Sequence, residues 1–159
     1  MDYDIRSIEL DSVHTAVVRG RVPMDDISTW LPAAYDEVFG LLGRRGIIPA
    51  GPPFARYDLH GGTFEIEAGA PVASWVVAEG RVQPSSLPGG TAAVTTHIGP
   101  YDQLGDAVTA LTAWIDAHAG EPAGAHWEVY YSDPIREPDP HAWRTDVVMP
   151  MRSVARPVR

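Results

Sequence analysis

Hydrophobic and polar residues alternate along HWEVYYSDP, residues 126–134, with the period of two that is typical of a β-strand. Trp127 belongs to the apolar set, whereas Glu128 and Tyr130 belong to the set on the opposite face. Aromatic and β-branched residues dominate the stretch, as strands prefer. Glu128 stands between aromatic side chains. It is therefore either a solvent-facing residue or the charge centre of a pocket.

The same kind of pattern predicts the other elements. Residues 4–23 form a long β-like stretch that ends at Pro23, and apolar residues at helical spacing predict a helix over about Thr29–Arg45. Two short strands are expected around the Gly61–Gly62 turn, and a further strand at Trp75–Ala78. A loop rich in proline, serine and glycine follows at residues 84–90, and we expect it to join two halves of the chain.

The order of elements then begins again. It consists of a strand that closes on Pro100, a helix within residues 101–120, the strand at residues 126–134 and a final strand at Trp143–Met151. Alignment of Pro23 with Pro100 and of Tyr57 with Tyr130 places Ala55 opposite Glu128. The order indicates an internal duplication of a strand–helix–strand–strand (βαββ) unit.

This duplication predicts the fold class. We expect an α+β fold of tandem duplicated βαββ units with pseudo-twofold symmetry, in which antiparallel sheets carry two main helices on one side. Residues 1–159 would form a single domain, with half one at about 4–80 and half two at about 91–151. The groove between the halves is the expected place of a central ligand pocket, and Tyr57 and Glu128 would lie near it.

Composition excludes several classes of function. The 159 residues include no lysine and no cysteine and carry a net charge of −9, so we expect no nucleic-acid partner, no disulfide and no thiolate chemistry. No pair of the six histidines has the spacing of a zinc site, so neither a metal nor a cofactor is expected. Without a signal peptide or a membrane-spanning segment, the expected location is cytoplasmic, with no membrane partner.

Nucleophilic catalysis has little support in the sequence. Ser85 and Ser86 lie outside a G-x-S-x-G context, and neither His97 nor His126 has a serine or aspartate partner at a recognisable spacing. Asp102 is interpreted as a helix-start residue.

The ordered motifs HIGPYDQL, WIDAHAG, HWEVYYSDP and WRTDVVMPM, together with IIPAGPPFARYD in the first half, resemble the gyrase-inhibitor-like (GyrI-like) effector-binding domain. That module also forms the C-terminal part of some multidrug-responsive transcription activators. The resemblance extends from about His14 to Met151. The residues before His14 are too few for a helix-turn-helix, so we expect a stand-alone member of the family.

The resemblance implies a central, aromatic-lined pocket and assigns residues to it. A glutamate in a W-E-x-Y strand, here Glu128, would lie at the pocket base and meet cationic, flat aromatic ligands. A tyrosine after a G-x-P-F-x-x-Y run, here Tyr57, would lie in the same pocket. Family position further implies ligand contacts for Phe54, Trp75, Trp143 and Met149, and the position of Tyr130 on the Glu128 face favours the pocket for it as well. Each of these large side chains also has a simpler interpretation as part of the core. Trp127 is expected against the helices.

Three hypotheses for function follow, in order of preference. The first is a multidrug-binding protein that takes hydrophobic, often cationic, aromatic small molecules. The second is a hydrolase of cyclopropane-bearing aromatic genotoxins, in which Glu128 activates water and Tyr57 donates a proton. Inhibition of a protein partner such as gyrase ranks last.

Overall fold

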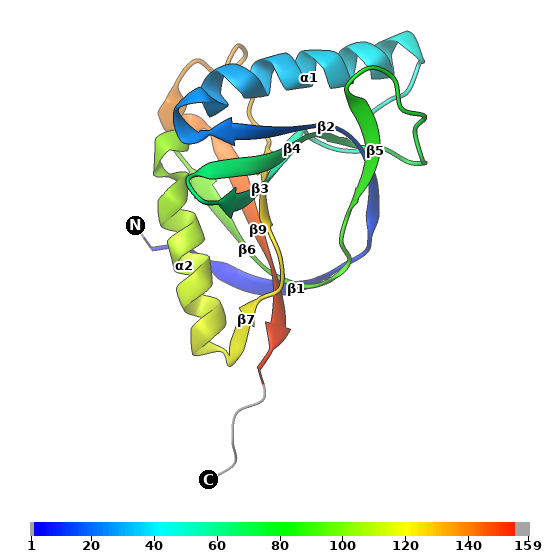
Figure 1. Cartoon of the computed structure of the whole chain (residues 1–159). Helices are drawn as coiled ribbons and strands as arrows, with labels where there is room; N and C mark the ends of the chain where they lie inside the picture. The colour runs from blue at the N-terminus through cyan, green and yellow to red at the C-terminus, as the bar shows by residue number, and fades with distance from the viewer. Residues whose placement is uncertain (1, 155–159) are drawn as a thin grey trace. The chain divides into compact units, whose positions relative to one another are not determined.

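The computed structural model describes residues 2–154, which divide into two compact units. We call residues Asp11–Gly89 the N-terminal unit. The C-terminal unit consists of residues up to Leu10 together with those from Gly90 onward. Each unit is an antiparallel sheet with one long helix, so the predicted α+β class is confirmed (Figure 1). Within the described residues, no helix combines the length and the apolar character that crossing a membrane requires.

The N-terminal unit contains a four-stranded sheet in the order β5-β2-β4-β3. Its elements are β2 (Val13–Pro23), η1 (Met24–Asp26), α1 (Ile27–Arg44), β3 (Phe54–His60), β4 (Thr63–Pro71) and β5 (Val82–Leu87). Helix α1 packs along β2 and β4, and it buries Ala34, Val38, Leu41 and Leu42 at helical spacing. The two glycines that join β3 to β4 have positive φ angles of 56° and 88°, which a two-residue hairpin turn requires.

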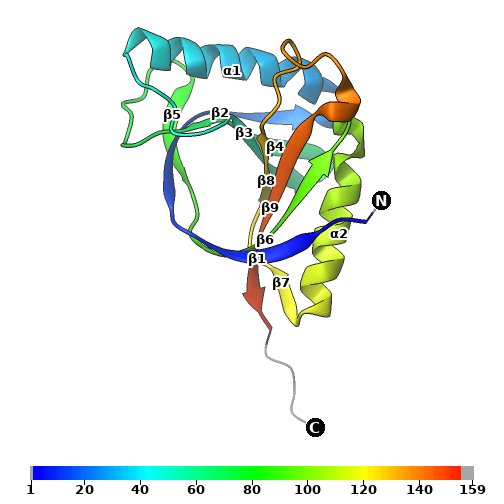
Figure 2. The ribbon, with the colours of Figure 1, turned by 180° about the vertical axis from the view of Figure 1, so that it is seen from behind.

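The C-terminal unit has the sheet order β1-β6-β9-β8, and β7 pairs with β9. Its elements are β1 (Ile5–Leu10), β6 (Gly90–Ile98), η2 (Tyr101–Gln103), α2 (Leu104–Ala117), β7 (Gly120–Pro122), β8 (His126–Tyr130), η3 (Pro140–Ala142) and β9 (Arg144–Ser153). Helix α2 packs on β6 and β9 (Figure 1), and seen from behind, β1 runs beside β6 (Figure 2). Leu104, Leu111 and Ile115 of α2 form a core with Val147 and Met149 of β9.

The two units have equivalent strand orders, which confirms the predicted duplication. Strand β1 corresponds to β5, and the β6-β9-β8 run corresponds to β2-β4-β3. The pairing registers also agree: Val18 pairs with Ala68, which pairs with Ala55, whereas Thr95 pairs with Val147, which pairs with Glu128. Val18 and Thr95 each lie five positions before the proline that ends the strand region. Ala55 and Glu128 therefore occupy equivalent positions, as the sequence alignment predicts.

Three sequence-based predictions about single elements are wrong. Trp75–Ala78 is not a strand, and the expected loop at residues 84–90 overlaps β5, which extends over Val82–Leu87. Proline is tolerated at Pro84 because β5 lies at the edge of its unit's sheet and pairs with β2 alone there. The N-terminal β-like stretch consists of two strands, and the first, β1, pairs with β6 of the C-terminal unit instead of remaining in half one.

The face of β8 that α2 covers also differs from the prediction. Paired residues in an antiparallel sheet share a face. Glu128 pairs with Val147, which packs against α2, whereas Trp127 pairs with Val148 on the opposite face. Trp127 is buried, but on the face of this sheet that α2 does not cover. Alternation along the strand correctly separated the two faces but did not show which of them the helix covers.

Candidate functional site

Glu128 lies in the middle of β8, on the sheet face that carries α2, and is only 8% exposed. The hydroxyl of Tyr130, two residues along the same strand, donates a 2.7 Å hydrogen bond to its Oε1. This contact confirms that Glu128 and Tyr130 share a face, as the alternation predicts. A buried carboxylate is costly unless it is hydrogen-bonded or paired with a cation, so the other partners of Glu128 matter.

The arginines near this strand form ion pairs with other carboxylates. Among the described residues of the C-terminal unit, arginine–carboxylate pairs join Arg136 to Asp133, Arg144 to Asp146, and Arg152 to Glu121. The basic side chain beside Glu128 is instead His126, whose Nε2 lies 3.9 Å from Oε2, beyond hydrogen-bond distance. Glu128 is thus held by a tyrosine hydroxyl and a nearby imidazole, without an arginine partner in the ion pairs of this unit.

Asp146 provides a comparison within the same unit. It is also 8% exposed, but it accepts a 2.7 Å hydrogen bond from Thr96 Oγ1 and lies 3.5 Å from Arg144 Nη2. Its charge is therefore compensated by a guanidinium in the manner usual for buried carboxylates. Asp146 and Glu128 are therefore equally buried, but among the arginine ion pairs described in this unit only that of Asp146 compensates a buried carboxylate.

Aromatic rings extend from the hydrogen-bonded tyrosine. The ring of Tyr101 lies 5.5 Å from that of Tyr130 and 4.5 Å from that of Trp143, measured between ring centroids. These separations fall within the range of stabilising aromatic pairs. Tyr130, Tyr101 and Trp143 form what we call the aromatic row, which adjoins the Glu128 carboxylate and can offer ring faces to a flat or cationic ligand.

The turn between β6 and α2 holds the aromatic row in place. The backbone N–H of Gly99 donates a 2.8 Å hydrogen bond to the carbonyl of Trp143. His97, fully buried, lies with Nε2 3.1 Å from the carbonyl of Pro100, and since a carbonyl can only accept, Nε2 carries the proton. Its Nδ1 then accepts the hydroxyl proton of Tyr3 at 2.8 Å. The buried imidazole thereby anchors the turn that presents Tyr101.

Burial and negative charge act together on Tyr101. Burial is the larger cause that raises the pKa of the Tyr101 hydroxyl above its ordinary value of 10.0, and the charges of Asp133 and Glu128 add to it. Tyr101 therefore keeps its proton at neutral pH. It faces the site as a neutral hydroxyl, and its ring remains free of negative charge of its own.

The remaining candidate residues lie in several environments. Met149 is 4% exposed and packs in the core under α2, where the hydroxyl of Thr112 lies 3.8 Å from its sulfur. In the N-terminal unit, Phe54 is buried and its carbonyl accepts a hydrogen bond from Tyr35. The ring of Tyr57 lies 6.0 Å from that of Phe64, edge to face. Trp75 is 63% exposed and contacts His14 through its ring edge.

The structure therefore brings Glu128, Tyr130 and Trp143 together within one unit, and it adds Tyr101, which the sequence-based prediction missed. Tyr101 follows directly after Pro100, at the position equivalent to Met24 after Pro23. An aromatic residue in one half opposite an aliphatic residue in the other is the signal that could have identified it. The roles that family resemblance assigns to Tyr57, Phe54, Trp75 and Met149 stay predictions.

Solved structures with the same fold agree with this architecture. The chain is similar to the EcmrR C-terminal domain, with a TM-score of 0.83 and 21% identity over 97% of this chain and 100% of that one. In EcmrR bound to DNA, the similarity has a TM-score of 0.81 and 20% identity and covers 96% of this chain. It covers 58% of that longer chain. A hydrolase from Listeria innocua has a TM-score of 0.70 at 14% identity, over 94% of this chain and 92% of the other.

SAV2435 bound to tetraphenylphosphonium shares the fold at a TM-score of 0.66 and 10% identity, over 96% of this chain and 94% of that one. Comparison with curated protein sequences gives no match. The family model of the GyrI-like small molecule binding domain, in contrast, matches residues 2–152, which is nearly the whole described chain. Together with its duplicated fold, this match shows that the chain belongs to the GyrI-like small molecule binding domain family.

Proposed function

We propose that this protein binds hydrophobic, cationic aromatic molecules and that Glu128 is the charge centre of the binding site. The observation that carries the proposal is a carboxylate only 8% exposed that accepts a hydrogen bond from a tyrosine hydroxyl. A lipophilic cation would compensate this charge as Arg144 compensates Asp146. The aromatic row adds ring faces, and each good cation–π contact contributes about 0.5–2 kcal/mol.

The duplication supplies an internal comparison for Glu128. The equivalent position in the N-terminal unit is Ala55, which is fully buried. The same βαββ arrangement therefore forms with an apolar methyl group at this position, and the fold itself does not require a carboxylate there. A buried charge that the architecture can do without is best explained by a ligand of opposite charge.

A solved structure with the same fold supports the proposal. SAV2435, which shares the fold, is known in complex with tetraphenylphosphonium, a cation surrounded by phenyl rings. That chemistry is what Glu128 and the aromatic row suit. The assignment of Tyr57, Phe54, Trp75 and Met149 as further ligand contacts remains part of the proposal. So does the cytoplasmic location.

A pair of aromatic phosphorus compounds tests the proposal. Tetraphenylphosphonium carries a positive charge, whereas triphenylphosphine oxide is neutral, and calorimetric titration measures the affinity of the protein for each. We expect Glu128→Gln to weaken phosphonium binding by roughly tenfold or more, because a charge pair near a protein surface contributes a few kcal/mol. Binding of the neutral compound should change much less. Asp146→Asn is the matched control, since Asp146 already has an arginine partner.

Equal losses for both compounds would show that Glu128 is not the charge centre. Saturable binding of neither compound to the native protein would contradict the binding proposal as a whole. Circular dichroism spectra of each variant would establish that a loss of affinity does not reflect unfolding.

A hydrolase is the second candidate, and one contact favours it. Glu128 accepts a 2.7 Å hydrogen bond from the phenol of Tyr130, so a buried carboxylate that can accept a proton lies beside an aromatic hydroxyl. The proton donor in the proposal is a different residue, Tyr57, which the family resemblance assigns. In this proposal Glu128 takes a proton from water as the water oxygen attacks a carbon of a strained cyclopropane ring. The ring C–C bond breaks, and the carbon that receives its electron pair takes a proton from Tyr57. Return of the proton from Glu128 to Tyr57 through solvent completes the cycle.

Mass spectrometry distinguishes this reaction from binding alone. Incubation with a cyclopropane-bearing aromatic electrophile should give the product of adding one water, at a rate lost in Glu128→Gln and in Tyr57→Phe. Binding without turnover would exclude the hydrolase and leave the binding proposal intact. Among the described residues, no observation favours gyrase as a partner.

A further inference from the structure

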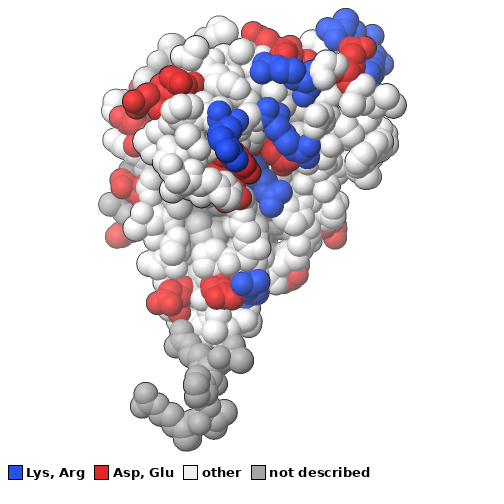
Figure 3. Space-filling model, viewed as in Figure 1, with Lys and Arg blue, Asp and Glu red and all other residues white. Residues whose placement is uncertain are grey.

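The exposed face of the N-terminal sheet carries ordered rows of charge across β2, β4 and β3 (Figure 3). In one row, Glu67 lies between two arginines, with Arg19 at 2.6 Å and Arg56 at 3.9 Å. In the next row, Arg21 pairs with Glu65 at 2.7 Å, but the residue across from Glu65 on β3 is Asp58. The position that carries an arginine in the first row thus carries a second carboxylate in the next.

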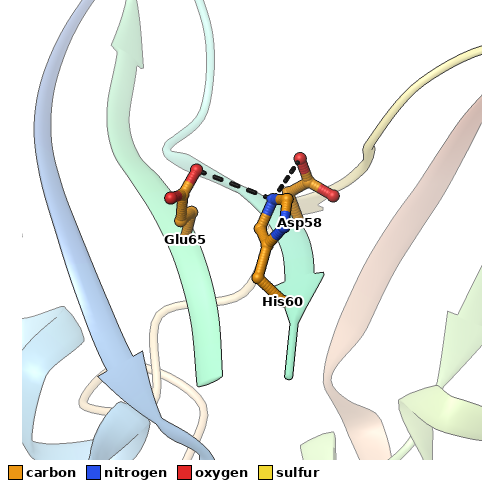
Figure 4. Close-up of side chains that lie close together, drawn as sticks. All are labelled: Asp58, His60 and Glu65. Carbon is orange, nitrogen blue, oxygen red and sulfur yellow. Dashed lines mark ion pairs between the residues drawn. The ribbon is translucent and has the colours of Figure 1, made fainter. Parts of the chain in front are cut away.

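Two like charges directly opposite each other on paired strands destabilise a sheet, so a cation between Asp58 and Glu65 would stabilise it. His60 meets both carboxylates. Its Nε2 lies 3.0 Å from Oδ2 of Asp58 and 3.7 Å from Oε2 of Glu65 (Figure 4). The three side chains point toward one another from the end of the β3–β4 hairpin, and their ligand atoms all lie within 4.8 Å of one another.

We propose that Asp58, His60 and Glu65 bind a divalent transition-metal ion of the zinc type. With bonds of about 2.0–2.2 Å to nitrogen and oxygen, adjacent ligand atoms around such an ion lie roughly 2.9–3.5 Å apart. The separations of 3.0 and 3.7 Å from Nε2 are already close to this range. Imidazole favours zinc, copper, nickel and iron over magnesium and calcium, which prefer oxygen ligands throughout.

The hairpin prepares the site before an ion arrives. Asp58 and His60 are two residues apart on β3 and therefore share a face, and Glu65 reaches that face from the paired strand. Arg21 holds Oε1 of Glu65 and leaves Oε2 directed at the imidazole, which is the role of an outer-shell partner. Roughly half of each ligand side chain is exposed, with values of 56%, 53% and 48% for Asp58, His60 and Glu65. Solvent or another ligand can therefore complete the coordination.

No metal site was predicted from the sequence, because that prediction rested on the spacing of histidines alone. Here one histidine combines with two carboxylates, and the third ligand is contributed by the paired strand. Only the hairpin register brings Glu65 beside Asp58.

Titration of tag-free protein with zinc chloride tests the site, followed by calorimetry and by the midpoint of thermal unfolding. We expect one ion per chain and a zinc-dependent rise of the unfolding midpoint, since a ligand that binds the folded state stabilises it. His60→Gln and Asp58→Asn should each weaken binding roughly tenfold or more, because even outer-shell partners change metal affinity by about 10–100-fold.

His141→Gln is the matched control. His141 is also exposed and lies beside one aspartate, with Nδ1 3.4 Å from Oδ1 of Asp139, but it is not part of a three-ligand group within the described chain. It should leave zinc affinity unchanged. Absence of zinc binding to the native protein would overturn the proposal. An equal loss in His141→Gln and His60→Gln would overturn it as well.

Discussion

The hydroxyl of Tyr130 donates a 2.7 Å hydrogen bond to Oε1 of Glu128, two residues before it on β8. This contact satisfies one oxygen of a carboxylate that is almost fully buried and leaves its negative charge without an arginine counterpart in the ion pairs of its unit. Stability and the proposed ligand binding therefore depend on the same carboxylate.

Tyr130→Phe should destabilise the protein by about 1–3 kcal/mol at neutral pH, because it leaves a buried carboxylate oxygen without its donor. Urea unfolding measures the change in the free energy of unfolding. In a Glu128→Gln background the same substitution should cost less, since a neutral amide oxygen is less costly to leave unpaired. Identical costs in the two backgrounds would show that the hydrogen bond to the charge is not what Tyr130 contributes.

Ala55→Glu should destabilise the protein by about 3 kcal/mol or more, because it places an uncompensated charge at the fully buried position equivalent to Glu128. Ala55→Gln has nearly the same volume without the charge and is the matched control. The difference between the two variants in urea unfolding isolates the effect of charge. Equal destabilisation would mean that volume alone excludes glutamate. The comparison of Ala55 with Glu128 would then no longer support a cost of burying charge at this position.

The raised pKa of Tyr101 predicts that the protein loses stability at alkaline pH. Burial, with the charges of Asp133 and Glu128, raises its pKa above 10.0 in the folded chain, so the folded state holds the phenol proton more tightly than the unfolded state. The stability that this provides is complete below about pH 10 and is lost as pH rises through the folded pKa. Urea unfolding over this pH range should show a smaller loss of the free energy of unfolding in Tyr101→Phe than in the native chain.

Phenolate absorbance provides an independent measurement of the same group. The pKa values of Tyr3 and Tyr131 are raised as well, so the contribution of Tyr101 is the part of the titration that Tyr101→Phe removes. Glu128→Gln removes one of the charges that raise the pKa of Tyr101, so this part of the titration should move toward lower pH. A titration curve that is unchanged by Glu128→Gln would contradict the proximity of the two side chains.

Gly69→Ala should destabilise the N-terminal unit by about 1–3 kcal/mol or more, the usual range for overpacking. A Cβ atom at Gly69 would lie 1.8 Å from the carbonyl oxygen of Ala16 on the paired strand, and backbone cannot move aside as a side chain can. Gly43→Ala is the control: it lies in α1 with nothing within 4 Å of the new methyl group. It should instead stabilise the protein by about 0.5–1 kcal/mol. Thermal unfolding of both variants checks the signs, and a stabilising Gly69→Ala would contradict the packing of β2 against β4.

Local patterns in the sequence determined both long helices, the strands β2, β3, β4, β6, β8 and β9, and the duplication. Alternation along residues 126–134 identified β8 and placed Glu128 beside Tyr130, and the two prolines that end equivalent strand regions aligned Ala55 with Glu128. Helical spacing predicted α1 and α2, because the apolar stripe that a helix buries recurs at a period set by its own geometry. These features depend on neighbours within one strand, one helix or one turn.

Partners that are distant along the chain were decided only by the tertiary structure. A period of two separates two strand faces, but only packing shows that α2 covers the face of Glu128 and not that of Trp127. Similarly, β1 pairs with the edge of β6 and not with a strand of half one, and no local pattern in the sequence predicts this pairing. The meeting of Tyr101 with Trp143, and of Glu65 with Asp58 and His60, follows from strand register, which hydrogen bonds between separate chain segments set.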